Sequence, residues 1–309
     1  MHPAPSIIIF TTLSGLGYGL AAVLGLGLLD PAALATKLAY LLALALISGG
    51  LLSSLLHLGN PQRAWRALTQ WRSSWLSREG VLAVATFAPL VCSAIAAWWS
   101  GRPIVLAGLA GTALAMVTVY CTAMIYGSLK SVQAWHTPLT AACYLLFAVS
   151  GGFLVGALFA AAGGRDGLGL MLFLALLFLV AAWIAKLLWW RRLAELRPQS
   201  TPESATGLGF IGRVRLLERP HVNENYLTSE MGFRVARKHA QKLTRIAFAA
   251  GGVVPGLIVA LLLILRAEPG WPATLMLCLA ALCHLAGVIV ERWLFFAEAR
   301  HAVMNYYGG

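Results

Sequence analysis

The stretch 57–80, HLGNPQRAWRALTQWRSSWLSREG, separates two long apolar runs of the chain. A Gly-Asn-Pro turn stops the run that ends at His57, and Glu79 opens the run that follows. The four arginines and three tryptophans between them form a mixture typical of the rim of a membrane. One imidazole and one carboxylate therefore stand at neighbouring helix ends, and we expect the chemistry of the protein there.

Apolar runs of this kind recur along the whole chain. Of its 309 residues, 60% are hydrophobic and 11% are charged, a composition that excludes an ordinary soluble protein. A helix that crosses a bilayer needs about 20 apolar residues. Eight segments meet this requirement, which predicts an all-α integral membrane protein: one membrane domain over 1–309, built as a bundle of eight transmembrane helices. The expected spans are 7–29, 36–58, 80–100, 103–126, 138–162, 167–190, 246–266 and 272–297.

The basic residues predict how the bundle is oriented. Eight crossings place both termini on one side, together with the loops 59–79, 127–137 and 191–245. That side carries nineteen lysines and arginines against four on the other, or eight against four without the long loop. We therefore expect both termini and the docking face in the cytoplasm, and the chain in the cytoplasmic membrane. The start, MHPAPS, has no basic residue before the first apolar run, which favours an uncleaved first helix.

The net charge, the histidines and the cysteines argue against nucleic-acid binding, haem and metal sites. The net charge of +12 lies between the apolar runs, so we interpret it as a topology signal and expect no nucleic acid as partner. Bis-histidine haem ligation needs two facing imidazoles at one depth, and among the seven histidines only His57 and His136 share a level, at helix ends that only a fortuitous approach would pair. We expect no haem, no iron–sulfur cluster and no metal site in this chain. The cysteines form no C-x-x-C pair and are interpreted as small buried hydrophobes: Cys92, Cys121, Cys143, Cys278 and Cys283.

The pair His57 and Glu79 suits quinone chemistry. Reducing a quinone takes two electrons and two protons, so its site needs an imidazole or carboxylate within hydrogen-bonding reach of the ring oxygens. Glu79 is expected in the first turn of its helix, where the helix dipole favours the carboxylate. Since the chain has no electron carrier of its own, an iron–sulfur partner within tunnelling range is required.

Three further features have two interpretations each. The helical spacing of four residues predicts a short amphipathic helix in the membrane interface: Trp65, Leu68, Arg72 and Trp75. The alternative is a plain belt of aromatic residues. The loop 191–245 ends in a basic run, RVARKHAQKLTR, that suits either anionic lipid or a partner subunit. His284 lies near the middle of the last span, where it either bonds a neighbouring helix or has a function.

At the opening stretch the chain resembles the DmsC family, the membrane anchor subunits of dimethyl sulfoxide reductase and related molybdoenzymes. The matching residues are LHLGNPQRAW (56–65) and the helix start Leu76-Ser77-Arg78-Glu79. Weaker likeness lies in Trp135-His-Thr-Pro, in Ala286-Gly287 and at Arg292. The eight-helix plan extends the resemblance over essentially the whole chain.

The resemblance implies a complex of three subunits. A molybdopterin catalytic subunit and a ferredoxin-like iron–sulfur subunit would handle substrate and electrons, and this chain would exchange the electrons with ubiquinone or menaquinone. It implicates His57 and Glu79 in quinone binding, and we assign Arg63 and Arg292 to the same quinone-binding and proton-transfer site. We assign docking of the partner to further basic residues: Arg66, Arg72, Arg78, Arg237 and Lys238.

Two departures from the enteric anchors of the family point to a particular branch. Enteric dimethyl sulfoxide reductase anchors dock their partners on the periplasmic side, whereas the charge distribution here favours the cytoplasm. The insertion RPHVNENYLTSEMGF (219–233) and the ending ERWLFFAEARHAV (291–303) resemble the anchor of cytoplasmic sulfite dehydrogenase. We therefore expect electrons from sulfite to reach quinone through this chain. The alternatives are a reductase anchor that oxidises quinol, an anchor without a quinone site and, remotely, a transporter.

Overall fold

The computed structural model describes residues 2–56, 58–164, 167–197, 200–215, 217–218 and 235–307. Its regular elements are all helical, and eight of its helices are long and apolar enough to cross a membrane. This confirms the predicted fold class. The first four spans are α1 (Pro5–Gly25), α2 (Leu34–Leu55), α3 (Trp75–Trp99) and α4 (Val105–Gly127). The last four are α5 (Pro138–Gly163), α6 (Leu168–Glu195), the composite span His239–Ile264, and α11 (Trp271–Ala297).

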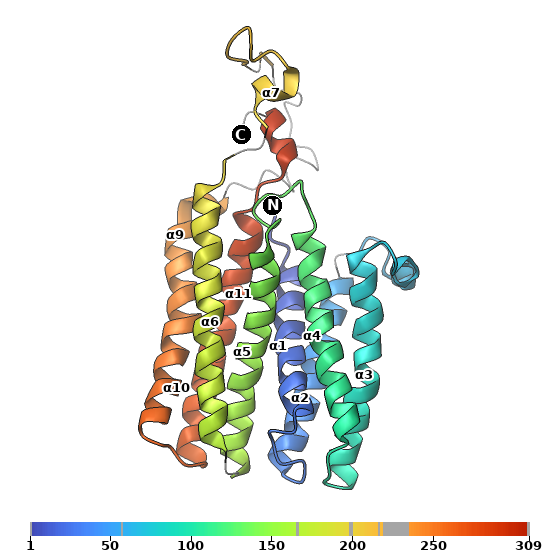
Figure 1. Cartoon of the computed structure of the whole chain (residues 1–309), viewed down its shortest axis with the longest axis vertical. Coiled ribbons are helices and arrows are strands. Elements are labelled where there is room, and N and C mark those ends of the chain that lie inside the picture. Colours follow the sequence, from blue (N-terminus) through green and yellow to red (C-terminus); the bar gives the residue numbers. More distant parts are fainter. Residues whose placement is uncertain are drawn as a thin grey trace.

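The composite span is continuous through three elements. It runs from α9 (Val235–Phe248) through a single π-helical turn, η2 (Ala249–Val253), into α10 (Val254–Ile264). Among the described residues, three short helices lie outside the spans: η1 (Pro61–Gln70), α7 (Pro202–Thr206) and η3 (Ala302–Tyr307). Figure 1 shows η1, α7 and η3 at one end of the bundle, the end at which both termini lie.

The bundle is organised around two central helices, α1 and α5. Their most apolar windows are 72% and 67% buried, against at most 44% for the other six spans. Helix α1 contacts α2, α4, α5 and α11, whereas α3 lies at one edge against α4 and α2, and α9 and α10 lie at the opposite edge against α11 (Figure 1). A helix that is apolar all round and buried by its neighbours is what a bundle core requires.

Glycines allow the central helices to touch backbone to backbone. Gly19 of α1 lies against the carbonyl of Ala148 and against Gly152 in α5, and Gly25 of α1 lies against Gly108 of α4. A β-carbon at any of these glycines would overlap the facing backbone. Small residues at such crossings increase the van der Waals contact that holds helices together in lipid. Gly50 of α2 lies against the backbone of Ser14 in α1 in the same way, whereas its neighbour Gly49 faces open space.

The observed start of α3 corrects the expected position of Glu79. The helix begins at Trp75, where the hydroxyl of Ser74 accepts a hydrogen bond from the backbone N–H of Ser77 at 3.4 Å. Glu79 therefore lies in the second turn, and the first turn holds no acidic residue. A serine N-cap satisfies a free N–H of the first turn, which explains why the helix starts before its continuous apolar run.

The interfacial segment also differs from expectation. We predicted one amphipathic helix through Trp65, Leu68, Arg72 and Trp75, but the structure divides these residues between two elements. The first two lie in η1, a 3₁₀-helix that has no buried residue, Arg72 lies in the linker after it, and Trp75 begins α3. Leu68 packs against Gly80 of α3, which fixes η1 to the end of the bundle.

The expectation that all five cysteines are buried is wrong. Cys121 and Cys143 are buried, but Cys92 and Cys278 are exposed on the outside of the bundle and Cys283 is half-buried, so cysteine is not confined to the core. Lys186 and Arg292, counted as signals of orientation, are only 1% and 2% exposed. Without these two, seventeen basic residues on the side of the termini face four on the other side. If the long loop 191–245 is also left out, only six remain against four. The orientation signal therefore depends on the 191–245 segment.

Candidate functional site

Glu79 occupies a buried position near the end of the bundle that carries both termini. Its side chain is 5% exposed, and its Oε1 atom has no hydrogen-bond partner among the described residues. Tyr18 of α1, Cys121 and Tyr126 of α4 lie close enough to interact with its charge, so the carboxyl faces the interior. A buried polar atom without a partner costs about 1–3 kcal/mol, so this position is suited to a ligand that can hydrogen-bond the carboxyl.

The arginines of η1 and its linker are exposed beside that position. Arg63, Arg66 and Arg72 are all exposed to solvent, and Arg66 and Arg72 lie over the rings of the tryptophans that precede them, at 5.7 and 5.4 Å. Arg78 is different, because its guanidinium donates to the carbonyls of Trp71 and Arg72 at 3.0 and 2.7 Å. It therefore holds the linker between η1 and α3 in place, although we expected it only as a docking residue.

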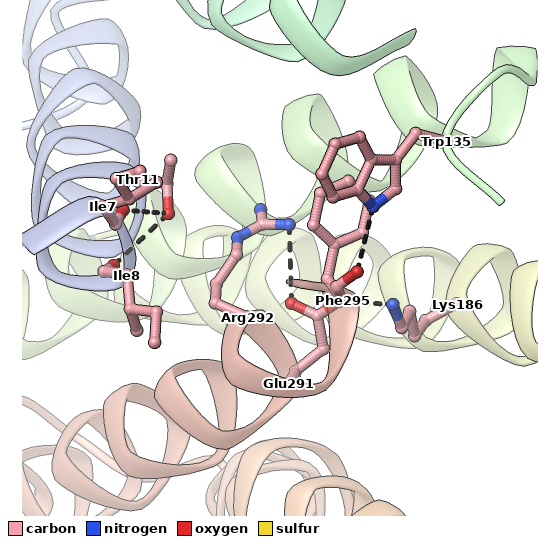
Figure 2. Close-up of polar contacts among 8 residues, drawn as sticks. All are labelled: Ile7, Ile8, Thr11, Trp135, Lys186, Glu291, Arg292 and Phe295. Atoms are coloured by element: carbon pink, nitrogen blue, oxygen red, sulfur yellow. Dashed lines mark hydrogen bonds and ion pairs between the residues drawn. The ribbon is translucent and has the colours of Figure 1, made fainter. Parts of the chain in front are cut away.

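Three charged side chains meet inside the bundle, between α6 and α11. Lys186 Nζ lies 2.6 Å from Glu291 Oε1, and Arg292 Nη1 lies 3.4 Å from Glu291 Oε2 (Figure 2). Each side chain is 3% exposed or less. Adjacent residues of a helix point in different directions, so Glu291 and Arg292 did not need to pair, yet the glutamate lies between both cations. Buried charges are costly unless they are paired in this way.

Aromatic rings surround this charge cluster. Lys186 Nζ lies 3.8 Å from the centre of the Trp189 ring, and the Arg292 guanidinium lies 3.7 Å from that of Tyr144 in α5. The ring of Trp135 stacks on Phe295 and its indole N–H donates to the Phe295 carbonyl at 2.9 Å, which ties the segment before α5 to α11 (Figure 2). Cations over aromatic faces gain about 0.5–2 kcal/mol, so the rings help to offset the burial of the cluster.

His284 bonds to a neighbouring helix, as one of its two interpretations predicts. Its Nδ1 atom lies 2.7 Å from the carbonyl oxygen of Gly251 in η2, and Trp183 of α6 donates to the same oxygen at 3.0 Å. A π-turn leaves a carbonyl outside the regular α-helical pattern, which frees it for side-chain donors. Since a carbonyl only accepts, the neutral imidazole carries its proton on Nδ1 and its Nε2 atom is an acceptor.

A small cavity joins the level of Arg292 to that of His284. It has a volume of ≈ 20 Å³ and lies between α1, α4, α5 and α11. At 1.5 Å per residue, Arg292 lies about 7.5 Å and His284 about 20 Å from the end of α11. Glu79 is about 6 Å from the start of α3, at the depth of Arg292. Eight of its fifteen lining residues have polar or charged side chains: Thr11, Thr12, Ser14, Tyr18, Thr122, Tyr144, His284 and Arg292.

The structure brings together only part of the quinone site predicted from the sequence. Glu79 and Arg292 are both buried and both interact electrostatically with Tyr126, which places them around one interior region. Arg63 is exposed on η1 and does not share their burial. His57 lies outside the described residues, as do the side chains of Arg237 and Lys238.

Sequence reasoning missed two residues of this region. Lys186 was counted as a basic residue near the membrane surface, and Tyr144 was not considered. The available signal was the position of Lys186 four residues before the end of its expected span, since an ionisable group within a span is a candidate for function. Tyr144 has no such signal, because only the packing of α5 against α11 brings it to Arg292.

These features define a class: a multi-pass helical membrane protein with an exposed basic segment and a buried polar interior at one end. The chain belongs to the DmsC family, the DMSO reductase anchor subunits, whose sequence pattern matches residues 1–297. It is also 30% identical to a subunit of the sulfite dehydrogenase of Allochromatium vinosum, over 99% of both chains. The family resemblance stated from the sequence is therefore confirmed.

Proposed function

We propose that this chain is the membrane anchor of a molybdoenzyme complex and exchanges electrons with a quinone beside Glu79. The observation that carries the proposal is the buried Glu79 carboxyl, whose Oε1 atom lacks a partner among the described residues. A quinone would supply the two-electron chemistry when bound there, and its ring oxygens suit a single carboxyl as hydrogen-bond partner. The family description and the whole-length relative both support the anchor role.

The residues of this chain would hold and exchange protons for that reaction. Glu79 can accept a hydrogen bond as carboxylate or donate one as carboxylic acid, so it can take a proton from a quinol or give one to a reduced quinone. His57, assigned with it from the sequence, would act on the same ligand. Arg292 lies in the buried region and supplies a positive charge that stabilises negative charge nearby.

An iron–sulfur subunit and a molybdopterin subunit would complete the electron path. Arg66 and Arg72 are exposed, and we propose them, with the α9 segment that holds Arg237 and Lys238, as the surface that docks the partner. Complementary charge accelerates and orients such docking. The basic 191–245 segment favours this face in the cytoplasm.

The proposed substrate of the complex is sulfite, with electrons passing to quinone. The support is the name of the whole-length relative, which describes it as part of a sulfite dehydrogenase. A reductase of S- or N-oxides that draws electrons from quinol is the second candidate, and the family description favours it. The two differ in the direction of electron flow, which a site built from a carboxyl and an imidazole does not fix.

The test uses the intact complex in membrane vesicles of both orientations. Sulfite-dependent reduction of a soluble ubiquinone or menaquinone analogue is expected in inside-out vesicles only. Activity confined to right-side-out vesicles would invert the orientation, and dimethyl sulfoxide reduction by quinol without sulfite oxidation would select the second candidate.

A variant series separates the quinone site from the assembly of the complex. Glu79→Gln should lower quinone-linked turnover by roughly 10²-fold while sulfite oxidation with an artificial electron acceptor stays normal. Glu195→Gln, at an exposed position of α6, is the matched control. Normal quinone kinetics in the Glu79 variant would show that the site is misplaced.

A further inference from the structure

The cavity between α1, α4, α5 and α11 is lined by polar atoms that have no partner. Among the described residues, the hydroxyls of Tyr18, Tyr144 and Thr12 and the Nε atom of Arg292 are buried without a hydrogen bond. Each such atom costs about 1–3 kcal/mol when it stays unsatisfied. Four of them around one cavity indicate that something polar occupies it.

The geometry of His284 adds a fifth group to this set. Because its Nδ1–H donates to the Gly251 carbonyl, its neutral ring presents Nε2 as an acceptor, and His284 lines the same cavity. The cavity therefore offers an acceptor from α11, hydroxyls from α1 and α5, and an N–H donor from Arg292. A water molecule both donates and accepts, so it can satisfy groups of both kinds at once.

The size of the cavity decides between water and a larger ligand. A buried water needs a space of about 10–15 Å³ and two to four polar partners. The volume of ≈ 20 Å³ meets that requirement but leaves no room for a quinone ring. The occupant that fits both the volume and the polar lining is water.

The position of the cavity connects it to Glu79. Tyr18 lines the cavity and also lies close enough to Glu79 to interact with its charge, and each has a buried oxygen without a partner among the described residues. Thr11, at the other border, lies about 9 Å from the start of α1, at the end of the bundle that carries both termini. The polar lining thus extends from about the depth of Glu79 inward to the depth of His284.

We propose that the cavity binds ordered water between Tyr18, Tyr144, Arg292 and His284, and that this water carries protons to and from Glu79. A proton that leaves the Glu79 carboxyl passes to the Tyr18 hydroxyl as that hydroxyl releases its own proton to a water oxygen, and the water in turn releases a proton to the next acceptor. No bond other than O–H is made or broken, and the water and the tyrosine hydroxyls are unchanged after each passage. The relay rests on the proposed function of Glu79, whereas the binding of water does not.

Radiolytic labelling of the intact complex in ¹⁸O-enriched water tests the water site alone. Side chains beside bound water are hydroxylated by it even when they are buried, so Tyr18 and Tyr144 should be labelled. Phe153, buried and stacked on Phe178 away from the cavity, is the internal control and should stay unlabelled. Tyrosine labelling no greater than that of Phe153 would overturn the water site and leave the quinone proposal standing.

Kinetics of two variants test the relay. Tyr144→Phe and His284→Gln should each lower kcat for quinone-linked turnover by about tenfold, less than the ~10²-fold expected of a group that itself transfers the proton, because water partly replaces a lost group. The solvent deuterium isotope effect should rise while KM for the quinone analogue stays constant.

Trp183→Phe is the matched control for these variants. It removes the other hydrogen bond to the Gly251 carbonyl, but Trp183 does not line the cavity. If it lowers kcat and raises the isotope effect as much as His284→Gln does, His284 has only a structural role and the relay is wrong. If Tyr144→Phe and His284→Gln leave both quantities unchanged while Glu79→Gln abolishes turnover, the relay fails and the quinone site stands.

Discussion

The arginines of η1 and of the linker after it lie at the same end of the bundle as the cations between α6 and α11, but in the opposite environment. Arg66 and Arg72 are exposed and lie over neighbouring tryptophan rings, whereas Lys186 and Arg292 are buried around Glu291. Exposed charges contribute to association with other molecules, and buried charges must be neutralised within the fold. The same residue types therefore serve a surface in one region and the integrity of the bundle in the other.

The largest effect is expected from removing the acid of the buried cluster. Glu291→Gln leaves Lys186 and Arg292 uncompensated, which should destabilise the protein by about 3–5 kcal/mol, as breaking a buried ion pair does. Thermal unfolding of the detergent-solubilised complex measures it. The control is Glu195→Gln, which breaks an exposed pair with Arg191 and should have little effect. Equal melting temperatures for the two variants would show that the buried cluster does not stabilise the fold.

A smaller effect is expected from Arg78, which ties α3 to the linker after η1. Arg78→Ala removes two hydrogen bonds to the carbonyls of Trp71 and Arg72, so the segment 61–74 should lose roughly 1–2 kcal/mol of local stability. Hydrogen exchange of the η1 amides should accelerate, while that of α1 stays unchanged. Arg72→Ala, which keeps both accepting carbonyls, is the control. Unchanged η1 exchange in the Arg78 variant would mean that Leu68 and Gly80 hold the segment without it.

The exposed arginines should affect association and leave stability unchanged. The double variant Arg66→Ala/Arg72→Ala is expected to melt like the unmodified protein, because these side chains make no buried contact. Binding of the iron–sulfur subunit should become slower and less dependent on salt. Surface plasmon resonance at two ionic strengths measures both. A lower melting temperature with normal binding would assign these arginines to the fold.

The smallest effect concerns Glu298, a half-buried residue just after α11. Burial raises the pKa of its carboxyl above the ordinary 4.5, and nearby Lys186 partly opposes this shift. The folded protein binds this proton more tightly than the unfolded chain does, so the contribution to stability is full below about pH 4.5 and is lost as the pH rises through the raised pKa. Melting temperatures of Glu298→Gln should decline less over that interval. A parallel decline would locate the pH dependence elsewhere.

The eight spans could be predicted because the length of an apolar run is enough to identify a helix that crosses the membrane. The ends of the helices could not, since they depend on local bonds such as the Ser74 cap, which moved Glu79 into the second turn of α3. The family was recognisable from a short contiguous motif, LHLGNPQRAW, whose information lies in neighbouring residues.

The interior region could be predicted only in part. Glu79 and Arg292 belong to different helices, and their common burial around Tyr126 follows from the packing of α3, α4 and α11 about α1. Whether a lysine such as Lys186 lies on the surface or in a charge cluster depends on which face of α6 meets α11. A charge count weighs both cases equally, which is why the orientation signal was overstated.

The glycine contacts of α1 have a consequence for the membrane in which the protein sits. Where Gly19 lies against Gly152, and Gly25 against Gly108, the backbones touch and leave no space between them for a water molecule. These contacts lie beyond the cavity, in the half of the bundle remote from the termini. A water path along α1 is therefore interrupted at these two crossings, which separates the polar interior near the termini from the opposite side of the membrane.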